Sequence, residues 1–281
     1  MTITHIITLL GTGIVAGFAG GLLGLGGAFI MTPVQYMVYV NMGIPTDMAI
    51  KLAFGTNLLV ILPTAISGTW RHHRNRAVWW KAAIIMGSCS LIGALGGSTI
   101  ATHLPGAALK IAFGAITLVS AIRMLTAGLP QIEEEPKDNP WLWAAWALPI
   151  GIITGLIGIG GGILAIPVMT LALRFKMHTA VATSLAMMIL TSAGGVTGYI
   201  INGIGVTNLP AYSIGCINLQ LGYVNLQSWF LLAVTSIGMA QVGAITSHHL
   251  PAKQLRYIFI TMMFYLGLKM LGVFDWLGWP I

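Results

Sequence analysis

Charged side chains are scarce in this sequence, since Asp, Glu, Lys and Arg together account for only 7% of its 281 residues. A soluble domain typically has about a quarter of its residues charged. Hydrophobic residues make up 57% of the chain, so too little polar surface is available to cover a water-soluble globule. Because a helix needs about 20 apolar residues to cross a bilayer, the many apolar runs predict an all-α, polytopic membrane protein.

Acidic residues are the rarest charges, and most of them fall in one polar stretch. This stretch contains Glu133, Glu134, Glu135 and Asp138. The other two acids, Asp47 and Asp275, stand near the ends of apolar segments. Carboxylates inside a membrane usually mark proton or cation coupling. The distribution therefore disfavours a proton relay through buried acids.

Signatures of catalysis and of bound metal are also missing. The sequence contains no His-Glu-x-x-His, no Gly-x-Ser-x-Gly and no pair of acids within an apolar segment. An intramembrane enzyme, the rival hypothesis from another class, would need one of these sets. Cys89 and Cys216 stand alone, without the spacing of a metal site or of a disulfide framework. We therefore expect no catalytic residues, no metal and no cofactor.

The formal net charge of +7 does not indicate a nucleic-acid partner. The basic residues lie in short loops between apolar segments and form no continuous polar face. The positive-inside rule, by which cytoplasmic loops carry excess Lys and Arg, explains them better. The expected partners are the lipid bilayer and a small solute, and the sequence leaves association into a homo-oligomer open.

Apolar segments occur in the same order on both sides of a polar linker at 128–140. In the first half, 1–127, the segments are 3–23, 28–41, 47–70, 77–102 and 108–127. In the second half, 141–281, they are 141–157, 162–174, 178–200, 225–247 and 253–273. This organisation predicts two membrane repeats joined by a cytoplasmic linker.

Individual residues match between the two halves as well. Gly21-Leu-Leu-Gly-Leu-Gly-Gly27 reappears as Gly155-Leu-Ile-Gly-Ile-Gly-Gly161, and Pro33 as Pro167. The further matches in the same order are Thr56-Asn57-Leu58 with Thr183-Ser184-Leu185, His103-Leu-Pro105 with His249-Leu-Pro251, and Arg123-Met-Leu125 with Lys269-Met-Leu271. Chance similarity between apolar segments does not give four ordered matches, so we infer an internal duplication.

The charges of equivalent loops predict that the halves are inverted. The loop after the third segment of the first half carries Arg71, Arg74 and Arg76, whereas its counterpart at 201–227 carries no Lys or Arg. Positive-inside places the first loop in the cytoplasm and the second outside. Threading the chain from this choice puts both termini on the extracytoplasmic side of the cell (inner) membrane.

The second segment of each half is too short to cross the membrane. A helix of 13 or 14 residues is only about 20 Å long at 1.5 Å per residue, whereas the hydrocarbon core is about 30 Å thick. The first two segments of each half are therefore expected to form a broken or re-entrant helical hairpin. Counting each hairpin as one element gives four helical elements per repeat.

Glycine-rich tips connect the two arms of each predicted hairpin. The candidate residues are Gly24, Gly26, Gly27 and Ala28 in the first tip, and Gly158, Gly160, Gly161 and Gly162 in the second. Glycine permits positive φ and close approach to the backbone, and each tip opens a helix whose first N–H groups are unpaired and bind anions. Two tips that meet near the midplane would form one anion site. The alternative is that the glycines only allow close helix packing.

Four polar residues near the start of the third segments could complete this site. Thr56 and Asn57 in the first half correspond to Thr183 and Ser184 in the second. Their hydroxyl and amide groups could donate hydrogen bonds to an oxyanion. The alternative is hydrogen bonding between helices or to carbonyl groups of the same helix. Gln35 and Tyr36 are weaker candidates.

The histidines and most tryptophans are expected at the membrane interfaces. The histidines are His5, His72, His73, His103, His178, His248 and His249. The tryptophans near segment ends are Trp70, Trp79, Trp80, Trp141, Trp143, Trp146, Trp276 and Trp279. We interpret the histidines as interfacial loop residues rather than proton-coupling groups, and the tryptophans as an anchoring belt.

The doubled Gly-x-x-Gly-[Leu/Ile]-Gly-Gly motif with its following proline, together with the Thr-Asn/Ser-Leu pairs, resembles the sulfite exporter TauE/SafE family, also known as the 4-toluene sulfonate uptake permeases. The resemblance covers about 10–273. It implies transport of sulfite, sulfoacetate or another organosulfonate by alternating access, with an anion channel of the same architecture as the alternative. Ala28 stands where the second half has Gly162, and Asn57 where it has Ser184, so the two half-sites differ chemically.

Overall fold

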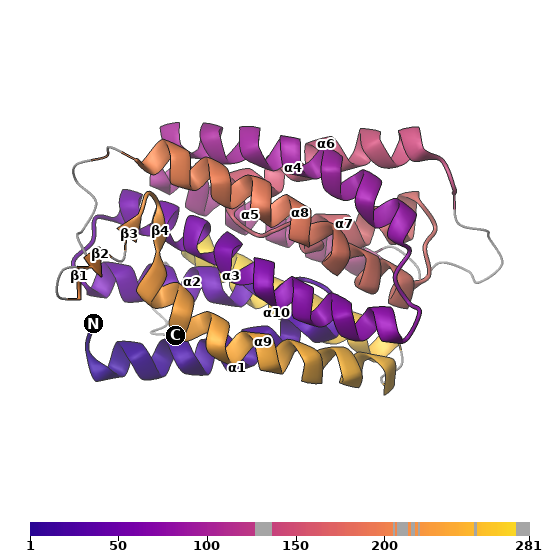
Figure 1. The fold of residues 1–281 in the computed structure, drawn as a ribbon, viewed down its shortest axis with the longest axis horizontal. Coiled ribbons are helices and arrows are strands. Elements are labelled where there is room, and N and C mark those ends of the chain that lie inside the picture. Colours follow the sequence, from indigo (N-terminus) through magenta and orange to yellow (C-terminus); the bar gives the residue numbers. More distant parts are fainter. Residues whose placement is uncertain are drawn as a thin grey trace.

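The computed structural model describes residues 1–126, 137–204, 206, 213–214, 217–218, 220–249 and 252–273. Within these residues the chain is almost entirely helical (Figure 1). The helices of the first half are α1 Ile3–Leu23, α2 Ala28–Asn41, α3 Thr46–Arg74, α4 Trp80–His103 and α5 Gly106–Thr126. Those of the second half are α6 Pro140–Ile157, α7 Gly162–Pro167, α8 Met177–Gly203, α9 Leu226–His249 and α10 Ala252–Met270.

Seven of the described helices are long and apolar enough to cross a membrane. They are α1, α3, α4, α5, α6, α8 and α9. The long helices run roughly along one axis of the bundle (Figure 1), and α10 adds a further apolar stretch, Ile260–Met270. Exposed apolar side chains such as Ile92, Ile111 and Val119 cover the outer faces, as contact with lipid requires. The predicted all-α, polytopic membrane fold is confirmed.

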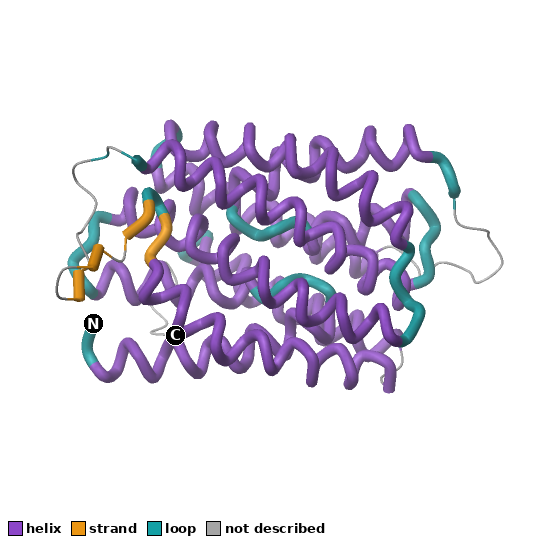
Figure 2. Tube along the Cα trace, viewed as in Figure 1, coloured by secondary structure: helices purple, strands orange, loops and turns teal. Residues whose placement is uncertain are grey.

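Both hairpins are broken at their glycine runs. α1 ends at Leu23 and α2 begins at Ala28, while α6 ends at Ile157 and α7 begins at Gly162. Glycine causes each break because a left-handed residue cannot continue a right-handed helix. Figure 2 shows the two connecting loops in the interior of the bundle.

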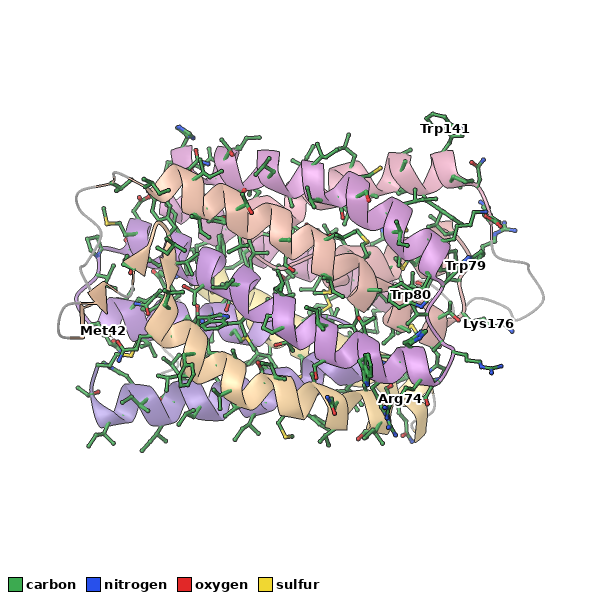
Figure 3. All side chains as sticks on the ribbon, viewed as in Figure 1. Met42, Arg74, Trp79, Trp80, Trp141 and Lys176 are labelled. Carbon is green, nitrogen blue, oxygen red and sulfur yellow. The ribbon has the colours of Figure 1, made fainter. Side chains whose placement is uncertain are left out.

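The two hairpins open toward opposite ends of the bundle. The N-terminus, where α1 starts, and Met42, which follows α2, lie at one end (Figures 1 and 3). Trp141, at the start of α6, and Lys176, beyond α7, lie at the other end (Figure 3). Each hairpin therefore returns to the end from which it entered.

The arm after the second tip departs from a simple α-helix. α7 spans six residues and continues as a π-helix, Val168–Ala172, directly after Pro167. Proline has no N–H and cannot make the regular helical hydrogen bond at its position. Farther along, Leu173 N–H donates to Val168 O at 3.0 Å and Phe175 N–H to Met169 O at 2.8 Å. The expected single short helix over 162–174 thus contains two helix types.

α3 and α8 form the centre of the bundle. Of their most apolar stretches, 78% of the residues in α3 and 67% in α8 are buried, compared with 39% in α5, α6 and α9. These two helices carry the four polar site candidates, Thr56, Asn57, Thr183 and Ser184, and all four are fully buried. Any group on their inner faces is therefore shielded from lipid.

Each hairpin packs against a helix of the other half through matched glycine contacts. Gly17 of α1 lies against the backbone of Ser236 in α9 so closely that a Cβ would overlap it. Gly151 of α6 lies in the same way against Ser90 in α4. Counting along from the matched segments of the sequence, Gly17 corresponds to Gly151 and Ser236 to Ser90. The same glycine contact therefore joins α1 of the first half to α9 of the second, and α6 of the second half to α4 of the first.

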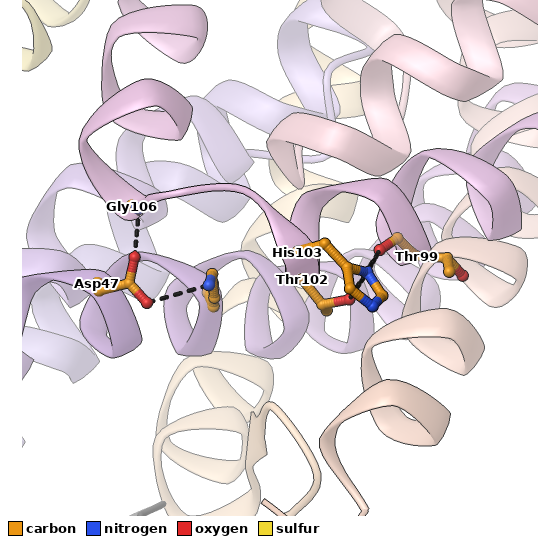
Figure 4. Close-up of polar contacts among 6 residues, drawn as sticks. Asp47, Thr99, Thr102, His103 and Gly106 are labelled. Carbon is orange, nitrogen blue, oxygen red and sulfur yellow. Dashed lines mark hydrogen bonds and ion pairs between the residues drawn. The ribbon is translucent and has the colours of Figure 1, made fainter.

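Asp47, at the start of α3, forms a hydrogen bond to the turn between α4 and α5 (Figure 4). Its carboxylate accepts hydrogen bonds from the N–H of Gly106, the first residue of α5, and from Lys51 Nζ at 3.0 Å. Lys51 is only 6% exposed, so this ion pair neutralises a buried ammonium group. At the end of α4, His103 Nδ1 lies 2.8 Å from the carbonyl oxygen of Thr99.

Two short β-hairpins precede α9 in the described residues, and the sequence analysis does not predict them. β1 Ser213–Ile214 pairs antiparallel with β2 Ile217–Asn218, and β3 Gln220–Leu221 with β4 Val224–Asn225. Strands of two residues are too short to show an alternating hydrophobic pattern. The second hairpin positions Asn225 directly at the start of α9.

Two interfacial expectations need correction. Trp143 is fully buried, because its ring packs with those of Trp79 and Phe175, at centroid distances of 5.4 and 6.3 Å. The prediction that the histidines lie in loops is wrong for all seven, since each falls within α1, α3, α4, α8 or α9. His72, in the last turn of α3, is also buried, with an exposure of 1%. Trp70, Trp80, Trp141 and Trp146 are exposed, as membrane anchors would be. Trp276, Trp279 and most of the linker lie outside the described residues.

Candidate functional site

The two glycine tips have the same backbone conformation. In the first tip Gly24, Gly26 and Gly27 have φ of +74°, +68° and +80°. In the second, Gly158, Gly160 and Gly161 have φ of +64°, +78° and +112°. Side chains other than glycine's rarely adopt this left-handed region. Glycine is therefore required at three corresponding positions of each tip.

Each tip presents a run of unpaired backbone donors. The amides from Gly26 to Phe29 and those from Gly160 to Ile163 donate to no acceptor among the described residues. All of these residues are buried. Buried N–H groups without a partner are rare in folded proteins, and at a helix start they carry the positive end of the helix dipole. This concentration of donors suits a negatively charged ligand.

The two tips touch each other in the bundle interior. The Cα of Gly162 lies so close to the first tip that a Cβ would be 2.6 Å from the carbonyl oxygen of Gly24. Ser184, one of the predicted site residues, donates its hydroxyl hydrogen bond to the same Gly24 carbonyl at 2.9 Å. These contacts explain why the second half has glycine where the first has Ala28.

Two apolar side chains cover both tips. A Cβ on Gly26 would lie 2.5 Å from Met188 Cε and 3.0 Å from Ile61 Cγ2. A Cβ on Gly160 would lie 2.8 Å from Ile61 Cδ1 and 3.1 Å from Met188 Cε. Ile61 on α3 corresponds to Met188 on α8, and both are fully buried. The space between the tips is therefore closed by one side chain from each half.

Thr56 and Thr183 bind the starts of neighbouring helices. Thr56 Oγ1 accepts a hydrogen bond from the N–H of Asn225 at 2.9 Å, just before α9. Thr183 Oγ1 accepts one from the N–H of Trp79 at 3.1 Å, just before α4. Both contacts cross between the halves, and Trp79 corresponds to Asn225. In this conformation the two hydroxyls position helices, and their role toward substrate stays a prediction.

Asn57 and its counterpart Ser184 have different hydrogen-bond partners, and Asn57 also has an acceptor atom that makes no hydrogen bond within the described residues. Its side-chain amide donates to Thr32 Oγ1 on α2 at 2.6 Å. Its Oδ1 atom is buried without a hydrogen-bond partner in the described part of the chain. The structure thus places Asn57 beside the first hairpin and leaves it an unused acceptor.

Sequence reasoning missed Ile61, Met188 and His72 as neighbours of the tips. His72 Nε2 lies 3.4 Å from the carbonyl oxygen of Gly21, just before the first break. At the corresponding place in the second half, Tyr199 donates its hydroxyl to Leu156 O at 3.2 Å. The sequence repeat could have pointed to Ile61 and Met188, because they lie at equivalent positions one turn beyond the matched pair Asn57 and Ser184.

The bundle, with broken helices meeting at its centre, defines a polytopic membrane protein of the transporter class. The chain belongs to the sulfite exporter TauE/SafE family, whose model matches residues 9–270. A probable membrane transporter protein of Methanocaldococcus jannaschii is 30% identical over 262 residues, covering 92% of each chain.

Two further relatives have the same description. A probable membrane transporter protein of Haemophilus influenzae is 24% identical over 95% of this chain and 98% of its own. One from Xylella fastidiosa is 32% identical over 66% of this chain and 70% of its own. No solved structure matches the sequence significantly. The identification as a membrane transporter therefore rests on sequence relatives and on the fold.

Proposed function

We propose that this transporter is a secondary carrier that moves small anions by alternating access, and that the two glycine tips bind the anion. The observation that carries the proposal is the pair of buried, unpaired amide runs, 26–29 and 160–163. Helix starts of this kind attract oxyanions without a charged side chain. This site contains no charged side chain, so releasing the anion does not break an ion pair between two full charges. The site can therefore both bind and release the anion.

Alternating access follows from an inverted-repeat arrangement, which two features support. The hairpins open toward opposite ends of the bundle (Figure 3). Cross-half contacts occur in corresponding pairs, as between Thr56 and Asn225 and between Thr183 and Trp79. Two structurally similar halves of opposite orientation have two nearly equivalent arrangements around a shared site, one open to each side.

The proposed orientation places the end that carries Arg74 and Lys176 in the cytoplasm. Both residues lie at the same end of the bundle (Figure 3), whereas the N-terminus lies at the other (Figure 1). Excess basic residues mark the cytoplasmic side. Under this proposal the protein is a multi-pass protein of the cell (inner) membrane with extracytoplasmic termini.

Ile61 and Met188 make the described conformation a closed one. Both side chains contact the two tips, so an anion and these side chains compete for the same space. In the transport cycle one or both side chains must withdraw before the amides can reach the anion. Met has three rotatable bonds and adapts its shape readily, which makes Met188 the easier of the two to displace.

The proposed substrate is sulfite, sulfoacetate or another organosulfonate. The family name supports a sulfur oxyanion, and the three oxygens of such a head suit several amide donors at once. The names of the relatives specify transport without a substrate.

A binding screen on purified protein tests the proposal. Sulfite, sulfoacetate, sulfate, taurine and simple carboxylates are compared by thermal shift, since selective binding raises the unfolding temperature. We expect stabilisation by at least one sulfur oxyanion and saturable counterflow of that anion in proteoliposomes. Currents much faster than conformational cycling would instead identify a channel. If no anion binds or moves, the proposal is wrong.

A further inference from the structure

Four buried polar side chains, on α2, on α3 and at the start of α9, have unused hydrogen-bonding groups. Gln35, Asn57, Asn225 and Ser228 are each 0% exposed. Within the described residues, Gln35 Nε2 and Oε1, Asn57 Oδ1, Asn225 Nδ2 and Ser228 Oγ have no partner. A buried polar group without a hydrogen-bond partner destabilises the fold. Four side chains with such groups indicate that something else satisfies them.

Hydrogen bonds place Asn57, Asn225 and Ser228 beside α2, α3 and the start of α9, and helical spacing adds Gln35. Asn57 on α3 bonds Thr32 on α2, and Gln35 lies on the same face of α2 because it is three residues from Thr32. Asn225 bonds Thr56, the neighbour of Asn57. Its Oδ1 also accepts from the N–H of Ser228 at 2.9 Å.

The corresponding positions beside the second hairpin are apolar and packed. Gln35 corresponds to Met169, Asn225 to Trp79 and Ser228 to Ala82. Met169 and Ala82 are fully buried in one apolar cluster, against which Trp79 packs. The three equivalent positions thus belong to one continuous apolar cluster. Beside the first hairpin, the corresponding positions carry polar side chains instead, although the fold accepts apolar ones there.

We propose that Gln35, Asn57, Asn225 and Ser228 form a polar subsite for the second end of the transported anion, and that this end is a hydroxyl. The proposal rests on the proposed function, since the charged end would bind the glycine tips. Asn57 lies four residues from Ile61, the cover of the tips, so about 6 Å separates them along α3. One small molecule can therefore reach both places.

The chemistry of the free groups selects the hydroxyl. The subsite offers donors from Gln35, Asn225 and Ser228 and acceptors from Gln35 and Asn57. A hydroxyl both donates and accepts, and so uses both kinds of group. A carboxylate only accepts and would bring a second buried charge, whereas an ammonium only donates and would lack a counter-charge. The subsite itself carries no charged side chain.

A matched pair of sulfonates tests the subsite. Isethionate (2-hydroxyethanesulfonate) and propane-1-sulfonate have the same charge and nearly the same shape, and differ by a hydroxyl in place of a methyl. We expect the wild-type protein to bind isethionate about tenfold more tightly, the effect of one or two neutral hydrogen bonds. Sulfoacetate and taurine should bind no better than propane-1-sulfonate.

Two variants replace a subsite residue with its counterpart from beside the second hairpin. Gln35→Met and Ser228→Ala should each reduce the affinity for isethionate about tenfold toward that of propane-1-sulfonate, whose own affinity should not change. Met169→Leu, at the position equivalent to Gln35, is the control and should keep the preference. Without ligand, Gln35→Met should unfold at a higher temperature than the wild type, because it removes an unsatisfied buried amide.

The outcomes separate this inference from the proposed function. Equal binding of the two sulfonates would overturn the subsite and leave the carrier standing. Binding of neither sulfonate, nor of any other sulfur oxyanion, would overturn both. A lower unfolding temperature for both Gln35→Met and Ser228→Ala would show that these groups serve the fold, and would also overturn the subsite.

Discussion

Thr64 Oγ1 on α3 lies 3.0 Å from Ser236 Oγ on α9, and the two fully buried hydroxyls share a hydrogen bond. The equivalent residues of the other half, Thr191 on α8 and Ser90 on α4, share one as well. Each bond joins a central helix of one half to a helix of the other. The two hydroxyl pairs therefore link the halves at corresponding positions.

Double-mutant cycles should give similar coupling energies for the two hydroxyl pairs. Thr64→Val with Ser236→Ala, and Thr191→Val with Ser90→Ala, each remove one hydrogen bond at nearly constant shape. We expect a coupling of about 0.5–1.5 kcal/mol in each cycle, measured by reversible unfolding in detergent. Thr246→Val, at an exposed hydroxyl bonded within its own helix, is the control. Coupling in one pair only would contradict equivalent roles of the halves.

Substituting one central glycine of either tip should abolish anion binding. Gly26→Ala and Gly160→Ala force a side chain into positive φ and into contact with Ile61 and Met188. We expect a loss of about 1–3 kcal/mol in stability from the backbone conformation alone. Thermal unfolding and anion binding on purified protein measure both effects.

Gly96→Ala on α4 is the matched control for the tip substitutions. A Cβ at Gly96 meets nothing within 4 Å, and alanine favours a helix over glycine by about 1 kcal/mol. Stability should stay the same or rise, and binding should not change. Folded Gly26→Ala and Gly160→Ala proteins that bind the anion as the wild type does would refute the glycine site.

Removing the cover of the tips should increase affinity while it lowers stability. Met188→Ala leaves a cavity that costs about 2–5 kcal/mol, but it also removes the side chain that competes with the anion. Met187→Ala is a matched control, because Met187 is equally buried in a different apolar cluster. Both variants should unfold at lower temperature, and only Met188→Ala should bind the anion more tightly. Weaker binding by Met188→Ala would contradict the competition.

Much of the fold could be predicted because long apolar runs end at glycine, proline and charged residues. The expected segments 3–23 and 28–41 coincide with α1 and α2, and 141–157 differs from α6 by one residue. The sequence places the end of α3 too early, since Arg71 and Arg74 belong to its last turn. Basic residues are favourable in the last turn of a helix as well as in loops, so charge alone does not mark the boundary.

The glycine tips could be located from the sequence, but their surroundings could not. Ile61 and Met188 are apolar residues within apolar helices, and hydrophobic periodicity does not distinguish them from ordinary core residues. Thr56 and Thr183 bond to the starts of α9 and α4, which depends on long-range packing. The unsatisfied Gln35, likewise, is recognisable only when its burial is known.

Cysteine labelling of intact cells should establish the orientation. Arg76→Cys, after α3, and Asn41→Cys, at the end of α2, replace exposed residues. In a background without Cys89 and Cys216, a membrane-impermeant thiol reagent should label Asn41→Cys in intact cells. Arg76→Cys should react only after permeabilisation. The reverse pattern would place the N-terminus in the cytoplasm.

The contact between Gly162 and the Gly24 carbonyl restricts how the protein can move. The backbone of one tip lies directly against the backbone of the other, so movement of either tip alone breaks this contact. In the proposed alternating-access cycle, opening the site to either side of the membrane must either separate the two tips or move both tips together. Turnover in this proposed cycle would then require the two main chains to part or to move together, in addition to the withdrawal of Ile61 or Met188.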